Sequence, residues 1–199
     1  MSFSILNIDD LDFNKSYTFA DYLTWNFQDR IELIKGKIFK MSPFPNRNHQ
    51  TISGNLFFEI KKIFINKSCK IYSAPFDVRL IDFKKSNEDQ QVTTVIQPDI
   101  CIICDQSKLD NKGCIGAPDL IIEILSPGNT EKEMSIKFDL YEENNVKEYW
   151  IVEPFDKTIF IYTLQNGKYI GLKPQTYSDT ISSPLFKEMN FEIKKAFED

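Results

Sequence analysis

The pattern of apolar and polar residues in the N-terminal part of the chain predicts two helices and a hairpin. A short helix is expected from Thr18 to about Phe27, with Thr18 as its cap and Asp21 three residues later. The run RIELIKGKIFKMS predicts a hairpin that turns at Lys35-Gly36. A longer helix is expected over about 47–66, because apolar residues at spacings of three and four share one face with the histidine: His49, Ile52, Leu56, Ile60 and Ile63.

Apolar runs in the rest of the chain predict strands, with one helix among them. The strands are expected in KIYSAP, FDVRLIDF, VTTVIQPDICIIC, DLIIEIL, KEYWIVEP, TIFIYTL and GKYIGL, and Pro98 interrupts the third. KKSNEDQQ predicts an exposed loop, and SPGN a turn before the helix TEKEMSIKFDLYEENN, where Thr130 and Glu133 form a capping box. Without repeats or a linker, we expect residues 1–199 to form one α/β domain whose mixed central β-sheet is flanked by helices.

Composition places the chain among globular, soluble proteins, with 42% hydrophobic and 14% aromatic residues. Its apolar runs are too short to span a bilayer, so no membrane association is expected. The N-terminus has no basic region leading into an apolar stretch, so we expect a cytoplasmic protein. In that compartment the four cysteines are expected to be reduced thiols rather than a disulfide framework.

Two of the cysteines, Cys101 and Cys104, form a CxxC, which raises zinc or redox chemistry as an alternative. However, ICIIC predicts a strand, in which that spacing puts the two thiols on opposite faces. The chain has no second CxxC, and Cys114 is expected in a loop. Structural thiols are therefore the favoured interpretation.

The net charge of −5 and the pI near 5.1 argue against a protein that coats nucleic acid non-specifically. Such binding depends on neutralising phosphates. A local basic groove remains compatible with this balance. Lysines gather at positions 61, 62, 67 and 70, at 84 and 85, and at 194 and 195, and a solvated surface is the favoured interpretation of each cluster.

Glu123 is out of place in the apolar strand DLIIEIL. Side chains alternate across a strand, so Glu123 shares a face with Ile121 and Leu125, while Leu120, Ile122 and Ile124 share the other. Neither face suits water. Because an unpaired buried carboxylate costs several kcal/mol, Glu123 is expected to have a partner.

Lys137 is the first candidate partner. It belongs to an apolar stripe of the following helix with Met134, Phe138 and Tyr141, and this stripe should pack onto the sheet. A helix that follows a strand by a short turn usually packs on that strand, so Lys137 could reach Glu123. Taken alone, the pair is interpreted as a buried ion pair, or Lys137 extends to the surface.

Asp99 changes this interpretation. It follows Pro98 at the edge of the strand in QPDICIIC, and pairing of that strand with DLIIEIL would bring Asp99 and Glu123 to one end of the sheet. Two close carboxylates repel each other unless a proton or cation lies between them. Oxygen ligands suit Mg²⁺ or Mn²⁺, and a nearby lysine can stabilise developing negative charge. Together these groups are the components of metal-assisted phosphodiester hydrolysis.

The combination of Pro98-Asp99, Glu123-Ile124-Leu125 and helical Lys137 resembles the PD-(D/E)XK nuclease superfamily, and more narrowly its Uma-type, restriction-endonuclease-like family. The resemblance covers about residues 18–165. Its blocks are IELIKGKIFKMSP, RNHQ, APFDVRL, QPDICIIC, GAPDLIIEILSPGN and IKFDLYEENNVKEYWIVEP. One position departs from the superfamily pattern: Leu125 stands where lysine is usual, and Lys137 is the matching lysine.

The resemblance implies a restriction-endonuclease-like core and a metal-dependent endonuclease acting on DNA. Asp99, Glu123 and Lys137 are the implied catalytic residues, with Mg²⁺ or Mn²⁺ on Asp99 and Glu123. Glu32 in RIELIKG is the implied further metal ligand. Nucleases of this fold often act as homodimers, although no interface is evident in this sequence. RNA remains open as the substrate.

Other candidate residues have simpler interpretations. His49 is favoured as a core or rim histidine, and Asp77 as a residue of strand pairing. Asp119 in the second Pro-Asp pair lies about 13 Å along the strand from Glu123, too far to share one metal, and is expected to face a loop. Trp25, Trp150 and most phenylalanines are expected in the core, although base stacking is an alternative. No Gly-rich phosphate loop is present.

A rival hypothesis comes from a different class. The fold could serve as a catalytically inactive module in binding or regulation, with the acid and lysine residues reduced to a structural network. The acidic pI and the displaced lysine are compatible with it. Metal binding that depends on Glu123 would separate the two hypotheses.

Overall fold

The computed structural model describes residues 5–41, 46–81, 88–127 and 131–198, with the backbone alone for 131–133. Several sequence predictions lie outside these residues. They are the first half of the KKSNEDQQ loop with Lys84 and Lys85, the end of the SPGN turn, and the capping box of Thr130 and Glu133.

The larger of two sheets contains the strand with Glu123. In spatial order its described strands are β12 (Lys168–Gly171), β11 (Thr158–Gln165), β10 (Glu148–Glu153), β9 (Leu120–Ile124), β6 (Ile100–Ile103) and β3 (Lys70–Ser73), with β13 (Gln175–Thr176) also paired to β11. The pair β9 and β10 is parallel and the other pairs are antiparallel. This is the mixed central sheet that the sequence predicts.

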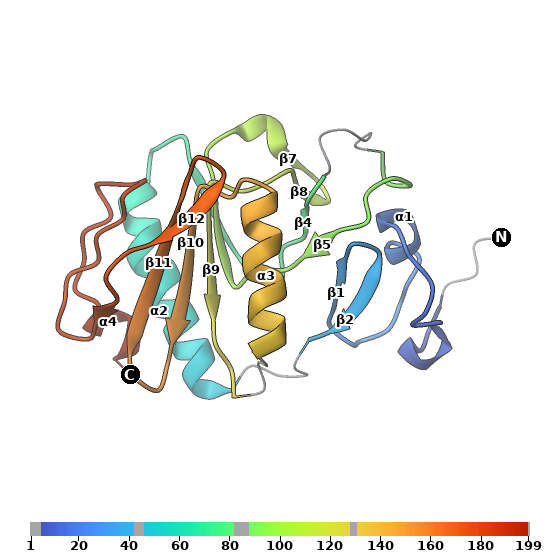
Figure 1. Cartoon of the computed structure of the whole chain (residues 1–199), viewed down its shortest axis with the longest axis horizontal. Helices are drawn as coiled ribbons and strands as arrows, with labels where there is room; N and C mark the ends of the chain where they lie inside the picture. The colour runs from blue at the N-terminus through green and yellow to red at the C-terminus, as the bar shows by residue number, and fades with distance from the viewer. Residues whose placement is uncertain (1–4, 42–45, 82–87, 128–130, 199) are drawn as a thin grey trace.

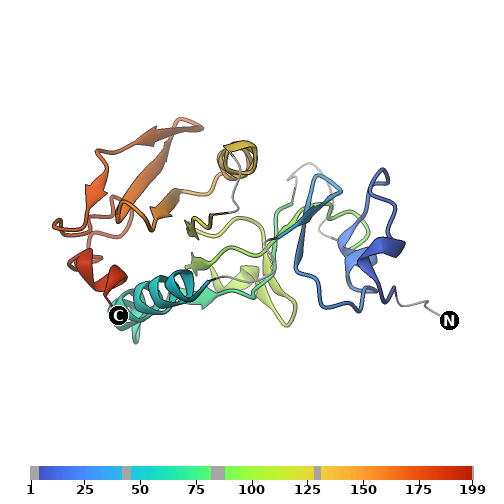
Figure 2. The ribbon, with the colours of Figure 1, turned by 90° about the horizontal axis from the view of Figure 1, so that it is seen from below.

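Two helices cover opposite faces of this sheet. Figures 1 and 2 show α2 (Arg47–Phe64) on one side of the strands and α3 (Glu131–Glu143) on the other. The alternation of β9 explains the arrangement. Its even-numbered residues join the α2 side of the core, while Ile121 joins the α3 side with Leu140 and Tyr141. Glu123 therefore faces α3, as the stripe containing Lys137 predicts.

A second, smaller mixed sheet stands beside the first. Its described strands are, in spatial order, β2 (Lys37–Lys40), β1 (Ile31–Ile34), β5 (Val95–Ile96), β4 (Val78–Arg79), β8 (Gly113–Ile115) and β7 (Leu109–Asp110). The predicted hairpin of β1 and β2 is confirmed. Lys35 and Gly36 at its turn have φ of 51° and 80°, the left-handed conformations that a two-residue hairpin turn requires.

The remaining described helices are short. They are η1 (Ile8–Asp10), α1 (Phe19–Tyr22), η2 (Gln106–Lys108) and α4 (Lys194–Phe197). The capping box of Thr18 and Asp21 at α1 is confirmed, but the helix ends at Tyr22 rather than near Phe27. Helix α2 likewise ends two residues before the expected boundary, at Phe64. None of the helices in the described ranges is long and apolar enough to cross a membrane.

The expectation of four reduced cysteines is wrong for two of them. Cys69 and Cys104 form a disulfide, whereas Cys101 and Cys114 are free and buried. The reason is strand register. Lys70 pairs with Ile103 in the antiparallel pair of β3 and β6, so the next positions outward, Cys69 and Cys104, face each other. The predicted opposite faces of Cys101 and Cys104 are confirmed, but Cys114 lies in β8 rather than in a loop.

Candidate active site

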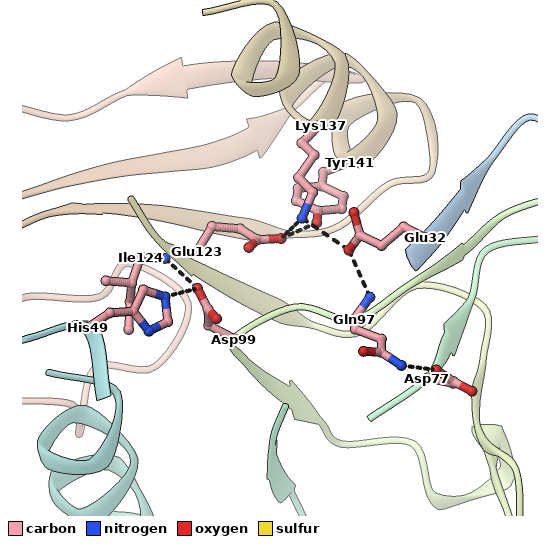
Figure 3. A network of polar contacts seen from close by, with 9 residues as sticks. All are labelled: Glu32, His49, Asp77, Gln97, Asp99, Glu123, Ile124, Lys137 and Tyr141. Atoms are coloured by element: carbon pink, nitrogen blue, oxygen red, sulfur yellow. Dashed lines mark hydrogen bonds and ion pairs between the residues drawn. The ribbon is translucent and has the colours of Figure 1, made fainter. Parts of the chain in front are cut away.

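Asp99 lies opposite Glu123 at one end of the paired strands β6 and β9. The register pairs Ile100 with Ile122, so the next position outward places Asp99 against Glu123. Two contacts hold the Asp99 carboxylate. Its Oδ2 accepts a hydrogen bond from the backbone N–H of Ile124 at 2.8 Å and lies 3.2 Å from Nε2 of His49 (Figure 3). The convergence expected from strand pairing is present.

Glu123 is held by two residues of α3. Its Oε1 accepts hydrogen bonds from the Lys137 ammonium at 2.9 Å and from the Tyr141 hydroxyl at 2.5 Å. Lys137 and Tyr141 are one helical turn apart, so both reach the same carboxylate. Burial raises the pKa of Glu123 to about 7, against the opposing effect of Lys137. Burial alone would lower the pKa of Lys137, but the neighbouring Glu123 and Glu32 raise it above its ordinary value.

Glu32 reaches the same lysine from the second sheet. It lies on β1 and is 3% exposed, and its Oε1 accepts hydrogen bonds from Lys137 Nζ at 3.1 Å and from the Gln97 backbone N–H at 2.9 Å. Figure 3 shows Lys137 between the two glutamates. The ammonium therefore joins carboxylates on two sheets, and the structure brings together all four residues that the sequence and the resemblance single out.

A cavity of about 300 Å³ opens onto these groups. Its polar wall contains Glu32, His49, Asp99, Glu123 and Lys137, together with Arg30, Lys40 and Ser126. Its apolar wall comes from β1, β2, α3 and their neighbours: Ile34, Phe39, Met41, Ile124, Leu125, Met134, Ile136 and Tyr149. The acids and the lysine are thus accessible from one concave site that also contains basic side chains.

Two acidic candidates lie elsewhere. The carboxylate of Asp77 accepts hydrogen bonds from Gln97 Nε2 at 2.8 Å and from the Tyr22 hydroxyl at 3.3 Å, and its backbone carbonyl accepts one from Cys114 N–H. Burial raises the pKa of Asp77. Asp119 lies at the opposite end of β9, where it pairs with Lys147 at 2.6 Å and accepts the Cys104 N–H. Neither residue lines the cavity.

The sequence analysis does not predict the contacts of His49 and Tyr141 with the acidic residues of the site. His49 is buried as a rim histidine should be, at 7% exposure, but it contacts Asp99 and lines the cavity. Asp99 raises its pKa despite the opposing effect of burial. The position of Tyr141, four residues after Lys137 on the same stripe, was the available signal for its contact with Glu123. No sequence signal linked His49 to Asp99, because the two residues are 50 positions apart.

The donor set suits a hard cation in part. Asp99 and Glu123 supply carboxylate oxygens at facing positions, and in the described ranges their contacts fall on Asp99 Oδ2 and Glu123 Oε1. Among the described residues, no hydrogen-bond partner falls on Asp99 Oδ1 or Glu123 Oε2. The described contacts of Glu32, with Lys137 and Gln97, likewise fall on a single oxygen, Oε1. Among the described residues no group of three or more His, Cys, Asp or Glu is already arranged around one metal position.

Comparison with known proteins identifies the family of the chain. The model of the Uma2 family, whose description is "Putative restriction endonuclease", matches residues 19–194. The chain belongs to the Uma2 family. The family match extends past the expected C-terminal limit near residue 165 and includes the segment that leads to α4. The resemblance inferred from Pro98-Asp99, Glu123 and Lys137 is confirmed at the level of the family.

Two individual proteins are similar to this Uma2 chain. The uncharacterized protein slr1290 of Synechocystis sp. is 26% identical over 145 residues, which is 71% of each chain. The crystal structure of a protein titled a putative nuclease belonging to DUF820, from Anabaena variabilis, superposes with a TM-score of 0.69 at 20% sequence identity. The match covers 91% of this chain and 97% of that one, so the two share the whole fold.

Proposed function

We propose that this Uma2 protein is a metal-dependent endonuclease that hydrolyses phosphodiester bonds in DNA. The observation that carries the proposal is the facing pair of Asp99 and Glu123, with Lys137 bonded to Glu123, at the wall of one cavity. Family membership supports the reaction class. Glu123 lies on strand β9 and Lys137 on helix α3, while Asp99 directly precedes strand β6 and is held by the backbone N–H of Ile124.

Asp99 and Glu123 would hold Mg²⁺ or Mn²⁺ through their carboxylates. Such an ion polarises a phosphoryl oxygen and lowers the pKa of water. Its charge would also favour the ionised form of Glu123, whose pKa burial raises to about 7. Glu32 would act on this site through Lys137, or as a further ligand when that contact opens.

Lys137 would orient the attacking water and stabilise negative charge on the phosphoryl oxygens in the transition state. In the balanced reaction, the water oxygen forms a bond to phosphorus and loses a proton. The bond from phosphorus to the leaving deoxyribose oxygen breaks, and that oxygen gains a proton. Two carboxylates hold the ammonium before substrate arrives, so little reorganisation is needed.

A second candidate function rests on the same ion pairs. Lys137 satisfies both Glu123 and Glu32 without any added group, which is what a purely structural network requires. In that case the Uma2 fold would serve as a binding or regulatory module. The two candidates differ in their response to metal.

The test combines Mn²⁺ titration calorimetry with cleavage of supercoiled plasmid DNA in Mn²⁺ and Mg²⁺. Asp99→Asn and Glu123→Gln should each weaken Mn²⁺ binding at least about tenfold and abolish cleavage. Lys137→Met should keep Mn²⁺ binding while cleavage is lost. Circular dichroism establishes that each variant remains folded.

Asp119→Asn is the matched control for Asp99→Asn. Both residues follow a proline, directly precede an apolar strand and are mostly buried, but Asp119 lies outside the cavity. Its variant should bind Mn²⁺ and cleave DNA like the parent. A parent that neither binds Mn²⁺ nor cleaves would reject the endonuclease proposal and support the structural network.

A further inference from the structure

A second cavity shares a wall with the first. It has a volume of about 550 Å³, and three residues line both cavities: Arg30, His49 and Asp99. The contact between His49 and Asp99 therefore separates the candidate metal site from a larger pocket. The rest of its wall comes from α2, the turn after β3, and residues near β1 and β5: Tyr22, Asp29, Ile31, Gln50, Ser53, Gly54, Phe57, Ser73, Ala74, Pro75 and Gln97.

Unpaired polar atoms concentrate on this wall. In the described part of the chain, four buried side-chain atoms have no hydrogen-bond partner, and three of them belong to residues of the second cavity. They are Nη2 of Arg30, Nδ1 of His49 and Oε1 of Gln97. A buried polar atom without a partner costs about 1–3 kcal/mol. These atoms are themselves enclosed, so a bound group would reach them only after the side chains turn toward the cavity.

Gly54 is a second, independent indication. It lies inside the 18-residue helix α2, where glycine is less favourable than alanine. Close packing does not require it, because a Cβ added there meets no atom within 4 Å. It lies on the wall of the second cavity, so a side chain at this position would project into open space. The glycine keeps this wall of the pocket open.

The chemistry of the wall suits one nucleotide. Arg30 offers a cation for a phosphate, and the aromatic side chains of Tyr22 and Phe57 line the wall that a base would contact. The Tyr22 hydroxyl is fixed by Gln97 Nε2 at 3.2 Å and by Asp77, so the ring is held in place. The exposed Asp29 on the wall is an acceptor for the N–H groups of a base edge.

We propose that the second cavity is a nucleotide-binding subsite, which receives one nucleotide of the DNA strand beside the phosphodiester bond that is cut. This inference rests on the endonuclease proposal for its position along the strand. The shared wall of His49 and Asp99 would place the bound nucleotide next to the reacting phosphate. Arg30, on both cavities, would contact the phosphate between them.

The experiment fills the cavity without touching the metal site. A fluorescein-labelled oligodeoxynucleotide is titrated by anisotropy in Ca²⁺, with Gly54→Ala and Gly54→Leu compared with the parent. Gly54→Leu should bind at least about tenfold more weakly, and Gly54→Ala should lie between it and the parent. Both variants should melt at or above the parent's temperature and bind Mn²⁺ equally well.

Two control variants keep the comparison specific. Phe58→Leu changes a 61%-exposed residue of the same helix outside the cavity and should bind DNA like the parent. Arg30→Gln should weaken binding at least about tenfold, whereas Lys70→Gln, which removes the same charge from β3 outside both cavities, should weaken it little.

The outcomes also separate this inference from the endonuclease proposal. Parental affinity in Gly54→Leu, or a parent that fails to bind the oligonucleotide, would overturn the subsite. In a third outcome the parent binds the oligonucleotide, Gly54→Leu binds it weakly, and the parent cleaves no DNA with any metal. This result would support the subsite and reject the nuclease reaction.

Discussion

The ammonium of Lys137 on α3 bonds the carboxylate of Glu32 on β1 at 3.1 Å, and so joins a helix on one sheet to a strand of the other. The same nitrogen bonds Glu123 at 2.9 Å. The side chain of Lys137 is 18% exposed and those of its partners are 4% and 12% exposed, so this is a mostly buried charge network.

Lys137→Met should lower the free energy of unfolding by about 3–5 kcal/mol near neutral pH, because it leaves two buried carboxylates without their cation. Urea denaturation followed by tryptophan fluorescence measures the change. Adding Glu32→Gln to Lys137→Met should restore part of the loss, because one unpaired charge is removed. Lys67→Met, at an ion pair with Glu188 whose two side chains are 42% and 44% exposed, is the control and should change stability little. If the control variant lost as much free energy of unfolding as Lys137→Met, burial would not explain the effect of Lys137.

His49 is expected to act as a positioning residue for Asp99. His49→Leu removes the contact with Asp99 Oδ2 and should weaken Mn²⁺ binding about 10–100-fold, the range typical of residues that orient metal ligands. His49→Gln keeps a donor and should recover part of the affinity. Calorimetric titration with Mn²⁺ measures both variants. If His49→Leu bound Mn²⁺ with the parent's affinity, the contact of His49 with Asp99 would not be needed to position the carboxylate.

The disulfide gives a prediction for thiol chemistry and stability. Native protein should contain two thiols, Cys101 and Cys114, that alkylate only after unfolding, because both are buried and burial raises their pKa. Mass spectrometry after alkylation, with and without reduction, counts them. Cys69→Ser should lower the free energy of unfolding by about 4 kcal/mol through loss of a 35-residue loop closure. Four rapidly alkylated thiols in the native protein would contradict the disulfide.

Glu148 gives the fold a pH dependence away from the active site. It is fully buried, and burial raises the pKa of its carboxyl despite hydrogen bonds from Ser183, Leu185 and Trp150. A raised carboxyl pKa contributes stability below the unfolded-state pKa, and this contribution is lost as the pH rises through the folded-state value. Between about pH 4 and 7, the parent should therefore lose stability relative to Glu148→Gln. Chemical denaturation across this range measures the difference. A parent that gains stability relative to Glu148→Gln as the pH rises would contradict a raised pKa.

The sequence predicts those parts of the site that depend on local periodicity. Alternation in DLIIEIL places Glu123 on an apolar face, and helical spacing places Lys137 on the stripe that packs there, so their contact was predictable. The site of Asp99 followed from one assumed strand pair, which the register of β6 and β9 confirms. Most strand positions followed from the same two periodicities.

Features that depend on distant pairing were not predictable. Cys69 faces Cys104 because of the register of β3 and β6, and a CxxC motif gives no indication of it. The contact of His49 with Asp99 requires that α2 begin beside the end of β6. The short α1 shows that a good cap does not fix a helix's length. The single domain, the cytoplasmic location and the homodimer stay predictions.

The arrangement of Glu32 on one sheet and Lys137 beside the other has a consequence for motion. If the contact between the two sheets opens locally, Glu32 and Lys137 separate while each sheet keeps its own backbone hydrogen bonds. Amide hydrogen exchange would then detect two events with different free energies: a smaller opening at β1 and β2, and global unfolding of β9 and β10. Catalytic competence would follow the first free energy rather than the second. A protein that circular dichroism and denaturation report as folded would thus spend part of its time with Glu32 and Lys137 apart.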